Sequence, residues 1–166
     1  MSCAYIAFTE TGLKLAERLA ISHPGSISRG GKNGVKLSEW TAENFQKSDA
    51  LIFIGAIGIA VRAIAPHCKS KATDPAVIVL DERGRISIPI LSGHLGGAND
   101  LAKKLASICG AVPVITTATD VEGVFAVDEW AKAQNCHVLE PERIKTVSGT
   151  LLADKAVYYD SQWNIT

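Results

Sequence analysis

Residues 86–99 read ISIPILSGHLGGAN, where a β-branched run leads through a glycine-rich loop into a helical pattern. Glycines in the loop allow positive φ angles and a close backbone approach to another group. The free N–H groups at the start of the coming helix carry a partial positive charge. A histidine and an asparagine lie in the same stretch. It therefore predicts a strand, a loop that holds an anionic or carbonyl-bearing ligand, and a helix.

Strands and helices alternate along most of the chain on either side of this stretch. Short apolar or β-branched runs predict strands, namely Cys3–Phe8, Ala50–Ile54, Ala76–Leu80, Arg85–Ile90, Val112–Thr116 and Ala156–Tyr159. Helical periodicity and caps predict helices at about 10–21, 42–47, 58–65, 98–109, 127–134 and 141–153. The glycine-rich residues 22–36 are expected to form a loop, as is Thr117–Asp120.

This alternation predicts an α/β fold with three layers, α/β/α, around a mostly parallel sheet. Asp81–Gly84 joins two β-branched runs and predicts one β-hairpin, so the sheet should be mixed. The helix at 58–65 is apolar nearly all round, with Arg62 as its only charge, and is expected to pack on several sides.

Composition excludes several classes of function. The 17 basic and 17 acidic residues cancel, which argues against nucleic acid or an anionic membrane as a partner. No apolar segment reaches the length of a membrane span, and no signal peptide is evident. The four cysteines form no Cys-x-x-Cys pair, so we expect reduced thiols, a cytoplasmic location and no protein-bound metal. The standard dinucleotide, P-loop and serine-hydrolase motifs are absent.

Three loops are expected at the carboxyl ends of strands, where open parallel sheets bind their ligands. They are Gly55–Gly58, Ser92–Asn99 and Thr116–Asp120. Together they could form one rim lined by backbone N–H groups and by four side chains, those of Arg62, His94, Asn99 and Asp120.

Each of these residues also has a purely structural interpretation. His94 could cap its helix, and Gly96 and Gly97 could serve only close helix–sheet packing. Arg62 could pair with the carboxylate of Asp74, which precedes a proline and could instead organise a turn. Asp120 could be an N-cap. The residues alone leave these alternatives open.

Four strings in the same order and spacing resemble the N-terminal domain of the cobalt-precorrin-5A hydrolases, the CbiG family. They are GIAVRAIAP at 58–66, KATDPAV at 71–77, DE-x-G at 81–84 and LSGHLGGAN at 91–99. The resemblance is strongest over residues 50–125, and residues 141–159 resemble the start of the family's middle region. It implies an N-terminal α/β domain at 1–137 and the start of the middle region at 138–166. The family's C-terminal domain is then expected to be absent from this chain.

The resemblance implies a hydrolase of the anaerobic branch of cobalamin biosynthesis. The family opens the δ-lactone of cobalt-precorrin-5A and releases acetaldehyde, giving cobalt-precorrin-5B, so a carbon–carbon bond is cleaved. Cobalt belongs to the substrate, and we expect no cofactor. The expected partners are this cobalt corrinoid and the missing C-terminal domain or other cobalamin-pathway enzymes, with no nucleic acid and no membrane.

The residues suit this chemistry. His94 could take a proton from water, with Asp120 as a second base or as the group that orients His94. The amides of Leu95, Gly96 and Gly97 could hold the tetrahedral oxyanion. Ile57, Ile59 and Leu95 could supply an apolar floor for the macrocycle. The full set of expected substrate-binding residues is Arg62, Lys71, Asp74, Ser92, Gly93, Leu95, Gly96, Gly97, Asn99, Gly55 and Gly58.

Two other functions stay open. In one, the chain is a tetrapyrrole-binding module and needs the C-terminal domain for catalysis. In the other, the chain is a small-anion-binding α/β domain outside cobalamin synthesis, because the glycine-rich loop by itself suits an anion.

Overall fold

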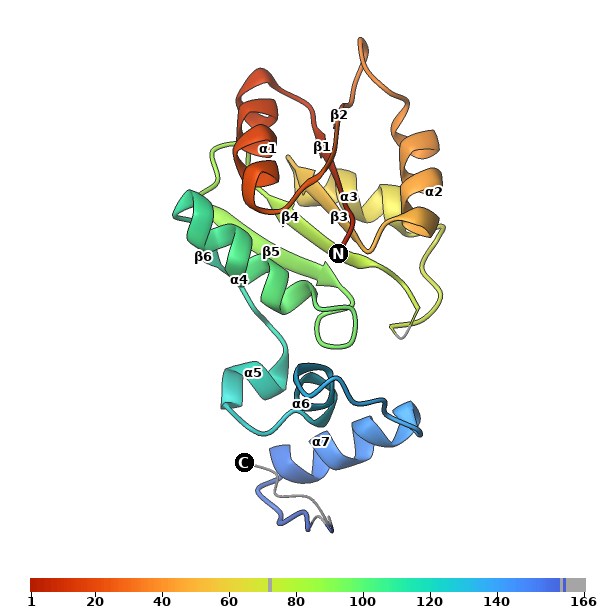
Figure 1. Cartoon of the computed structure of the whole chain (residues 1–166), viewed down its shortest axis with the longest axis vertical. Coiled ribbons are helices and arrows are strands. Elements are labelled where there is room, and N and C mark those ends of the chain that lie inside the picture. Colours follow the sequence, from red (N-terminus) through yellow and green to blue (C-terminus); the bar gives the residue numbers. More distant parts are fainter. Residues whose placement is uncertain (72, 159, 161–166) are drawn as a thin grey trace. The chain divides into compact units, whose positions relative to one another are not determined.

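The chain folds into two compact units, residues 1–115 and 116–166, in a computed structural model that describes residues 1–71, 73–158 and 160 (Figure 1). Each unit is described by itself. The domain boundary expected after residue 137 falls inside the second unit.

A six-stranded sheet forms the centre of the first unit, with the strand order β2-β1-β3-β4-β5-β6. The strands are β1 (Cys3–Ala7), β2 (Gly25–Arg29), β3 (Ala50–Ile54), β4 (Ala76–Leu80), β5 (Ile86–Leu91) and β6 (Val112–Pro113). Only β4 and β5 pair in antiparallel fashion, and the other neighbours run parallel. This confirms the mixed, mostly parallel sheet with one hairpin.

Helices cover both faces of the sheet, because alternate strand residues point to opposite sides (Figure 1). Tyr5, Ile52 and Ile78 point to one face and pack against α1 (Glu10–Ser22) and α4 (Ala98–Cys109). The intervening residues, such as Phe53, pack on the other face against α2 (Leu37–Lys47) and α3 (Ile57–Ile64). Both faces are thus buried, which explains the nearly continuous apolar runs of β1, β3 and β4.

Two predicted caps are present, one at the start of α1 and one at the end of α4. Thr9 Oγ1 accepts the Gly12 N–H at 3.0 Å and begins α1. Gly110 ends α4 with a left-handed φ of 79°, a conformation that glycine adopts at little steric cost. Gly84 has a φ of 64° in the hairpin, as its place in the turn predicts.

Two expectations for the first unit are wrong. Residues 25–29 lie in the predicted loop, but they form the edge strand β2, parallel to β1. Its sequence, GSISR, lacks an apolar run because the strand is exposed along most of its length. Helix α3 does not pack on several sides either, since Ile57 and Val61 are 40% and 47% exposed.

The second unit is built from short helices, namely α5 (Ala118–Glu122), α6 (Val127–Ala133), the 3-10 turn η1 (Pro141–Arg143) and α7 (Ile144–Leu152). The predicted loop at Thr117–Asp120 is therefore largely helical. No strand forms at 156–158, and Tyr159 lies outside the described residues. In the part of the chain that the structure describes, no helix is long and apolar enough to cross a membrane.

Candidate functional site

The three predicted loops do not form one rim. β5 runs antiparallel to β4, whereas β3 runs parallel to it. The Gly55–Gly58 loop leaves β3 at the carboxyl end of the parallel strands, but the Ser92–Asn99 loop leaves β5 at the opposite end, beside the start of β4. The hairpin causes this reversal. Gly55 and Gly58, with Arg62 bonded to Gly58, thus belong to the end of the sheet opposite the Ser92–Asn99 loop.

The Ser92–Asn99 loop lies against the segment that leads into β4. The Ser92 hydroxyl donates to the Asp74 carbonyl oxygen at 2.9 Å. The Asp74 carboxylate in turn accepts the backbone N–H groups of Lys69 and Ser70 at 2.8 and 3.0 Å. Lys71 belongs to this segment and is exposed. Of the predicted site residues outside the loop, Asp74 is therefore the one that contacts it, and Lys71 lies three residues before Asp74 in the sequence.

Glycines in the loop are required for two different reasons. Gly97 has a left-handed φ of 80°, and its N–H closes a turn onto the His94 carbonyl oxygen at 2.9 Å. Gly96 has no room for a side chain, because a Cβ there would lie 2.3 Å from Ser92 Cβ. At Gly93, a Cβ would lie 2.8 Å from Asn99 Oδ1. The loop is therefore packed tightly on itself.

The start of α4 is occupied by the loop's own carbonyl groups. The Ala98 N–H donates to the Ser92 carbonyl oxygen at 3.1 Å, and the Asn99 N–H donates to the Gly93 carbonyl oxygen at 3.0 Å. The expectation that these helix-start amides point at an anion is wrong, because they already have partners within the chain. The Gly97 amide is bonded as well, to the His94 carbonyl oxygen. The oxyanion role of the Leu95 and Gly96 amides stays a prediction.

Arg62 marks the other end of the sheet. Its Nη1 donates to the Gly58 carbonyl oxygen at 3.3 Å, which holds the guanidinium near the start of α3. The ion pair with Asp74 that the sequence allowed does not form among the described residues, where that carboxylate accepts the backbone N–H groups of Lys69 and Ser70. Ile57 and Ile59 lie at the start of α3, so they cannot share an apolar floor with Leu95.

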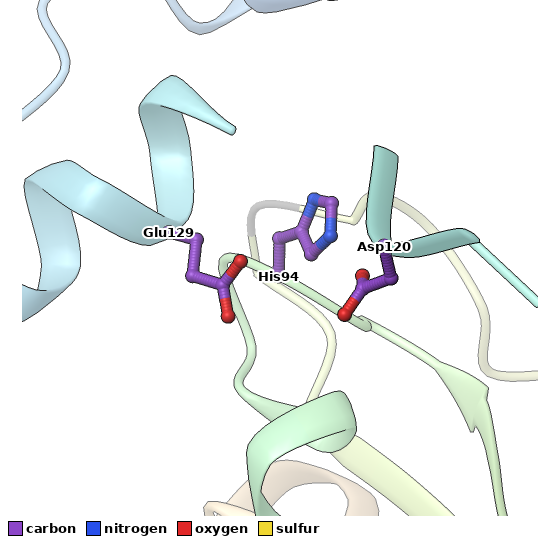
Figure 2. Close-up of side chains that lie close together, drawn as sticks. All are labelled: His94, Asp120 and Glu129. Carbon is purple, nitrogen blue, oxygen red and sulfur yellow. The ribbon is translucent and has the colours of Figure 1, made fainter. Parts of the chain in front are cut away.

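Figure 2 shows the side chains of His94, from the loop of the first unit, and of Asp120 and Glu129, from the second unit. Within the second unit, Asp120 lies in the first turn of α5 and Glu129 in the first turn of α6. Their carboxylate oxygens lie within 4.8 Å of each other. The N-cap of α5 is Thr117, so Asp120 is not the N-cap.

Glu129 was not singled out by the sequence. The available signal was an acidic residue in the first turn of each of two consecutive short helices. Two carboxylates can contribute oxygen ligands to a hard divalent cation, but such an ion takes six or more. The pair alone does not define a metal centre.

Cys68 is the thiol nearest to the Asp74 segment in sequence. Burial, followed by the negative charge of Asp74, raises the pKa of the Cys68 thiol above its usual value. A raised pKa disfavours the thiolate, which is the nucleophilic form. Cys68 is therefore a poor candidate for a catalytic nucleophile.

Comparisons with known proteins agree on one family. The family model described as cobalamin synthesis G, N-terminal, matches residues 39–120. A cobalt-precorrin-5A hydrolase from Salmonella typhimurium is 41% identical over 165 residues, covering 94% of this chain and 47% of that protein. A second, from Priestia megaterium, is 41% identical over 113 residues, covering 68% of this chain and 30% of that protein.

A solved structure shows the same fold. It is the crystal structure of a cobalamin biosynthesis protein G homologue from Sulfolobus solfataricus, with a TM-score of 0.58 and 25% identity. The match covers 99% of this chain and 51% of that chain. This chain thus spans about half the length of the Salmonella and Sulfolobus proteins, and less of the Priestia protein.

Proposed function

We infer the function from the premise that the chain belongs to the CbiG family of cobalamin synthesis. The curated relatives are named cobalt-precorrin-5A hydrolases. We propose that this chain serves the same step. The observation that carries the proposal is the position of the family match, because residues 39–120 include the whole Ser92–Asn99 loop with His94.

The proposed reaction consumes one water molecule. Water adds to the lactone carbonyl, giving a tetrahedral oxyanion, and the ring C–O bond then breaks. The alkoxide freed by ring opening then forms a carbonyl as a carbon–carbon bond breaks, and the two-carbon fragment leaves as acetaldehyde. The electron pair of the broken bond stays on the macrocycle, which takes up the proton removed from water. We assign His94 as the base that takes the proton from water, with Asp120 as the alternative base. The Leu95 and Gly96 N–H groups are the proposed oxyanion donors, and loss of one such donor typically raises the barrier by ~3 kcal/mol.

The substrate's acetate and propionate groups require cations. Lys71 is exposed in the segment next to the Ser92–Asn99 loop and suits one carboxylate. Arg62, with Gly55 and Gly58, lies at the other end of the sheet, where it suits a second carboxylate or a second molecule. Asn99 is only 2% exposed, so a contact with substrate is expected only if the loop opens.

The proposal includes no cofactor and no protein-bound metal, because cobalt enters with the substrate. It places the protein in the cytoplasm, with the corrinoid as its ligand and with other parts of the family's architecture or other enzymes of the route as partners. Nucleic acids and membranes are not expected partners, since the charge is balanced.

A second candidate function is a tetrapyrrole-binding module. It is favoured by the length comparison, since the chain covers about half of the Salmonella hydrolase. The bonded amides at the start of α4 also favour it, because they leave fewer donors for an oxyanion. In this case the corrinoid binds here and the lactone is opened by groups outside the chain.

The test of the first proposal is acetaldehyde release from cobalt-precorrin-5A by the whole chain. We expect His94→Ala to lower kcat by ~100-fold or more, the usual contribution of a general base. His137→Ala is the matched control, since His137 is exposed and has no assigned role. Turnover by His94→Ala at the wild-type rate would contradict the assignment of His94.

Spectral titration with the cobalt corrinoid separates the two functions. Saturable binding without acetaldehyde release, followed by release once a relative's remaining domain is added, is the result expected of the binding module. Binding of inorganic phosphate with no binding of the corrinoid would contradict both.

A further inference from the structure

Ser92 has an unusual conformation for a buried serine. Its φ is 57°, in the left-handed region, and it is 7% exposed. Among the described residues outside glycine, only Asn135 and Asp154 share a positive φ. Asparagine and aspartate tolerate this region well, whereas serine does so less often. A strained residue persists only where its surroundings hold it in place.

Three contacts hold Ser92. Its hydroxyl donates to the Asp74 carbonyl oxygen at 2.9 Å, and its own carbonyl oxygen accepts the Ala98 N–H at 3.1 Å. Gly96 lies so close that a Cβ there would be 2.7 Å from the Ser92 carbonyl oxygen. Ser92 therefore joins the segment before β4, the turn of the loop and the start of α4.

The Asp74 side of this contact is itself held firmly. The Asp74 carboxylate accepts two backbone N–H groups, from Lys69 and Ser70, and the residue is 8% exposed. Its carbonyl oxygen thus has a fixed position from which to accept the Ser92 hydroxyl. We call the hydrogen bond between them the Ser92–Asp74 latch.

We propose that Ser92 is a positioning residue for His94, acting through the Ser92–Asp74 latch, and that it does not contact the substrate. This inference rests on the proposed function of His94. His94 lies two residues after Ser92, and the turn that carries it is closed by Gly97. If the latch opens, the turn and the imidazole lose their fixed position, while the substrate's own binding groups are unchanged.

Hydrogen exchange tests the latch without any assay of activity. The amides to follow are those of Gly97, Ala98 and Asn99, which are bonded inside the loop. We expect them to exchange about tenfold faster in Ser92→Ala than in wild type, a change typical of one lost hydrogen bond. Ser92→Gly is the second variant, since glycine adopts a φ of 57° readily and should fold even if the alanine variant does not.

Ser87→Ala is the matched control. Ser87 is a fully buried serine on β5, and its hydroxyl donates to the Ala102 carbonyl oxygen at 3.0 Å. The control removes the same type of bond from the same stretch of chain. Ser87→Ala should lower global stability as much as Ser92→Ala does. The exchange rates of the three loop amides, compared with those of other amides, should stay as in wild type. If the three loop amides exchange equally fast in Ser92→Ala and Ser87→Ala, the Ser92–Asp74 latch does not hold the loop and the proposal is overturned.

Steady-state kinetics tests the link to His94. We expect both Ser92 variants to lower kcat about tenfold with KM within twofold of wild type, and Ser87→Ala to leave both unchanged. A rise in KM with unchanged kcat would show that Ser92 binds substrate and would overturn the proposal. If the wild-type chain releases no acetaldehyde, the proposed function fails, and hydrogen exchange still decides whether the latch holds the loop.

Discussion

At the scale of the residue, the Ser92–Asn99 loop owes its shape to specific steric limits. Gly97 is needed for its left-handed φ, while Gly93 and Gly96 are needed because neighbouring atoms occupy the space of a Cβ. The geometry therefore supports a structural role for these glycines, but the contacts lie within the loop and the start of α4 and are not the expected helix–sheet packing. This structural role does not compete with a role for His94, since a rigid loop is what a positioned base requires.

Gly96→Ala is expected to destabilise the first unit. The new Cβ would lie 2.3 Å from Ser92 Cβ, and neither the loop nor the start of α4 can yield without breaking bonds. We expect the free energy of unfolding to fall by ~2 kcal/mol, the usual cost of overpacking. Chemical denaturation measures it.

Gly58→Ala is the control for this substitution. Gly58 lies in the first turn of α3, and the nearest atom to its Cβ would be the flexible end of Arg62 at 3.3 Å. This variant should be as stable as wild type, or more stable by up to ~1 kcal/mol. A Gly96→Ala protein as stable as Gly58→Ala would contradict the steric account of the loop.

At the scale of the element, the β4–β5 hairpin decides where the candidate site lies. It carries the chain back to the amino ends of the parallel strands, so the glycine-rich loop meets the segment before β4. Another set of residues follows the carboxyl ends of β1, β3 and β4, among them Thr9, Gly55 and Glu82. These two ends are chemically distinct surfaces of one sheet.

Helix α1 offers a test of how its N-cap supports the sheet. Thr9 Oγ1 accepts the Gly12 N–H at 3.0 Å and donates to the Glu82 carboxylate at 2.9 Å. We expect Thr9→Ala to lower the free energy of unfolding by ~1 kcal/mol. Thr9→Ser should retain most of the wild-type free energy of unfolding, because serine caps a helix as well as threonine does.

Ser107→Ala is a suitable surface control for the capping variant. Ser107 is exposed on α4, and its hydroxyl bonds only within its own helix, to the Lys104 carbonyl oxygen at 2.7 Å. It should change stability by less than ~0.5 kcal/mol. If Thr9→Ala has no larger effect than this control in thermal or chemical unfolding, Thr9 does not stabilise the start of α1.

At the scale of the whole molecule, the two large clusters of buried apolar residues that the described part of the chain forms lie within the first unit. Both core clusters, on the two faces of the sheet, are made only of residues numbered 115 or lower. We expect residues 1–115, expressed alone, to fold and to unfold in one cooperative transition. Circular dichroism and the dispersion of amide resonances measure this. A fragment with helical signal but no cooperative transition would contradict the prediction.

Much of the fold could be predicted because it depends on local patterns. The runs of β1, β3 and β4, the cap at Thr9 and the turn at Gly84 are each specified by a few neighbouring residues. The edge strand β2 could not be predicted in this way. Its five residues carry no apolar pattern, and they form a strand because they pair in parallel with β1.

For the candidate site, the residue roles stay predictions, and the expected arrangement of three loops in one rim is wrong. His94 and the glycines around it follow from the sequence, as does the resemblance to CbiG. The single rim does not exist, although the predicted hairpin already implied that β5 runs backwards. The left-handed φ of Ser92 carries no local signal, since serine seldom adopts it.

By itself, then, the sequence determined the family, the α/β class, the order of most elements and the loop that carries His94, because periodicity, caps and motifs are properties of neighbouring residues. The tertiary structure alone decided which loops share an end of the sheet, which helix amides are already bonded, and that Ser92 contacts Asp74. Those outcomes depend on strand direction and on packing between residues far apart in the sequence, 18 positions apart in the case of Ser92 and Asp74, which short-range patterns do not encode.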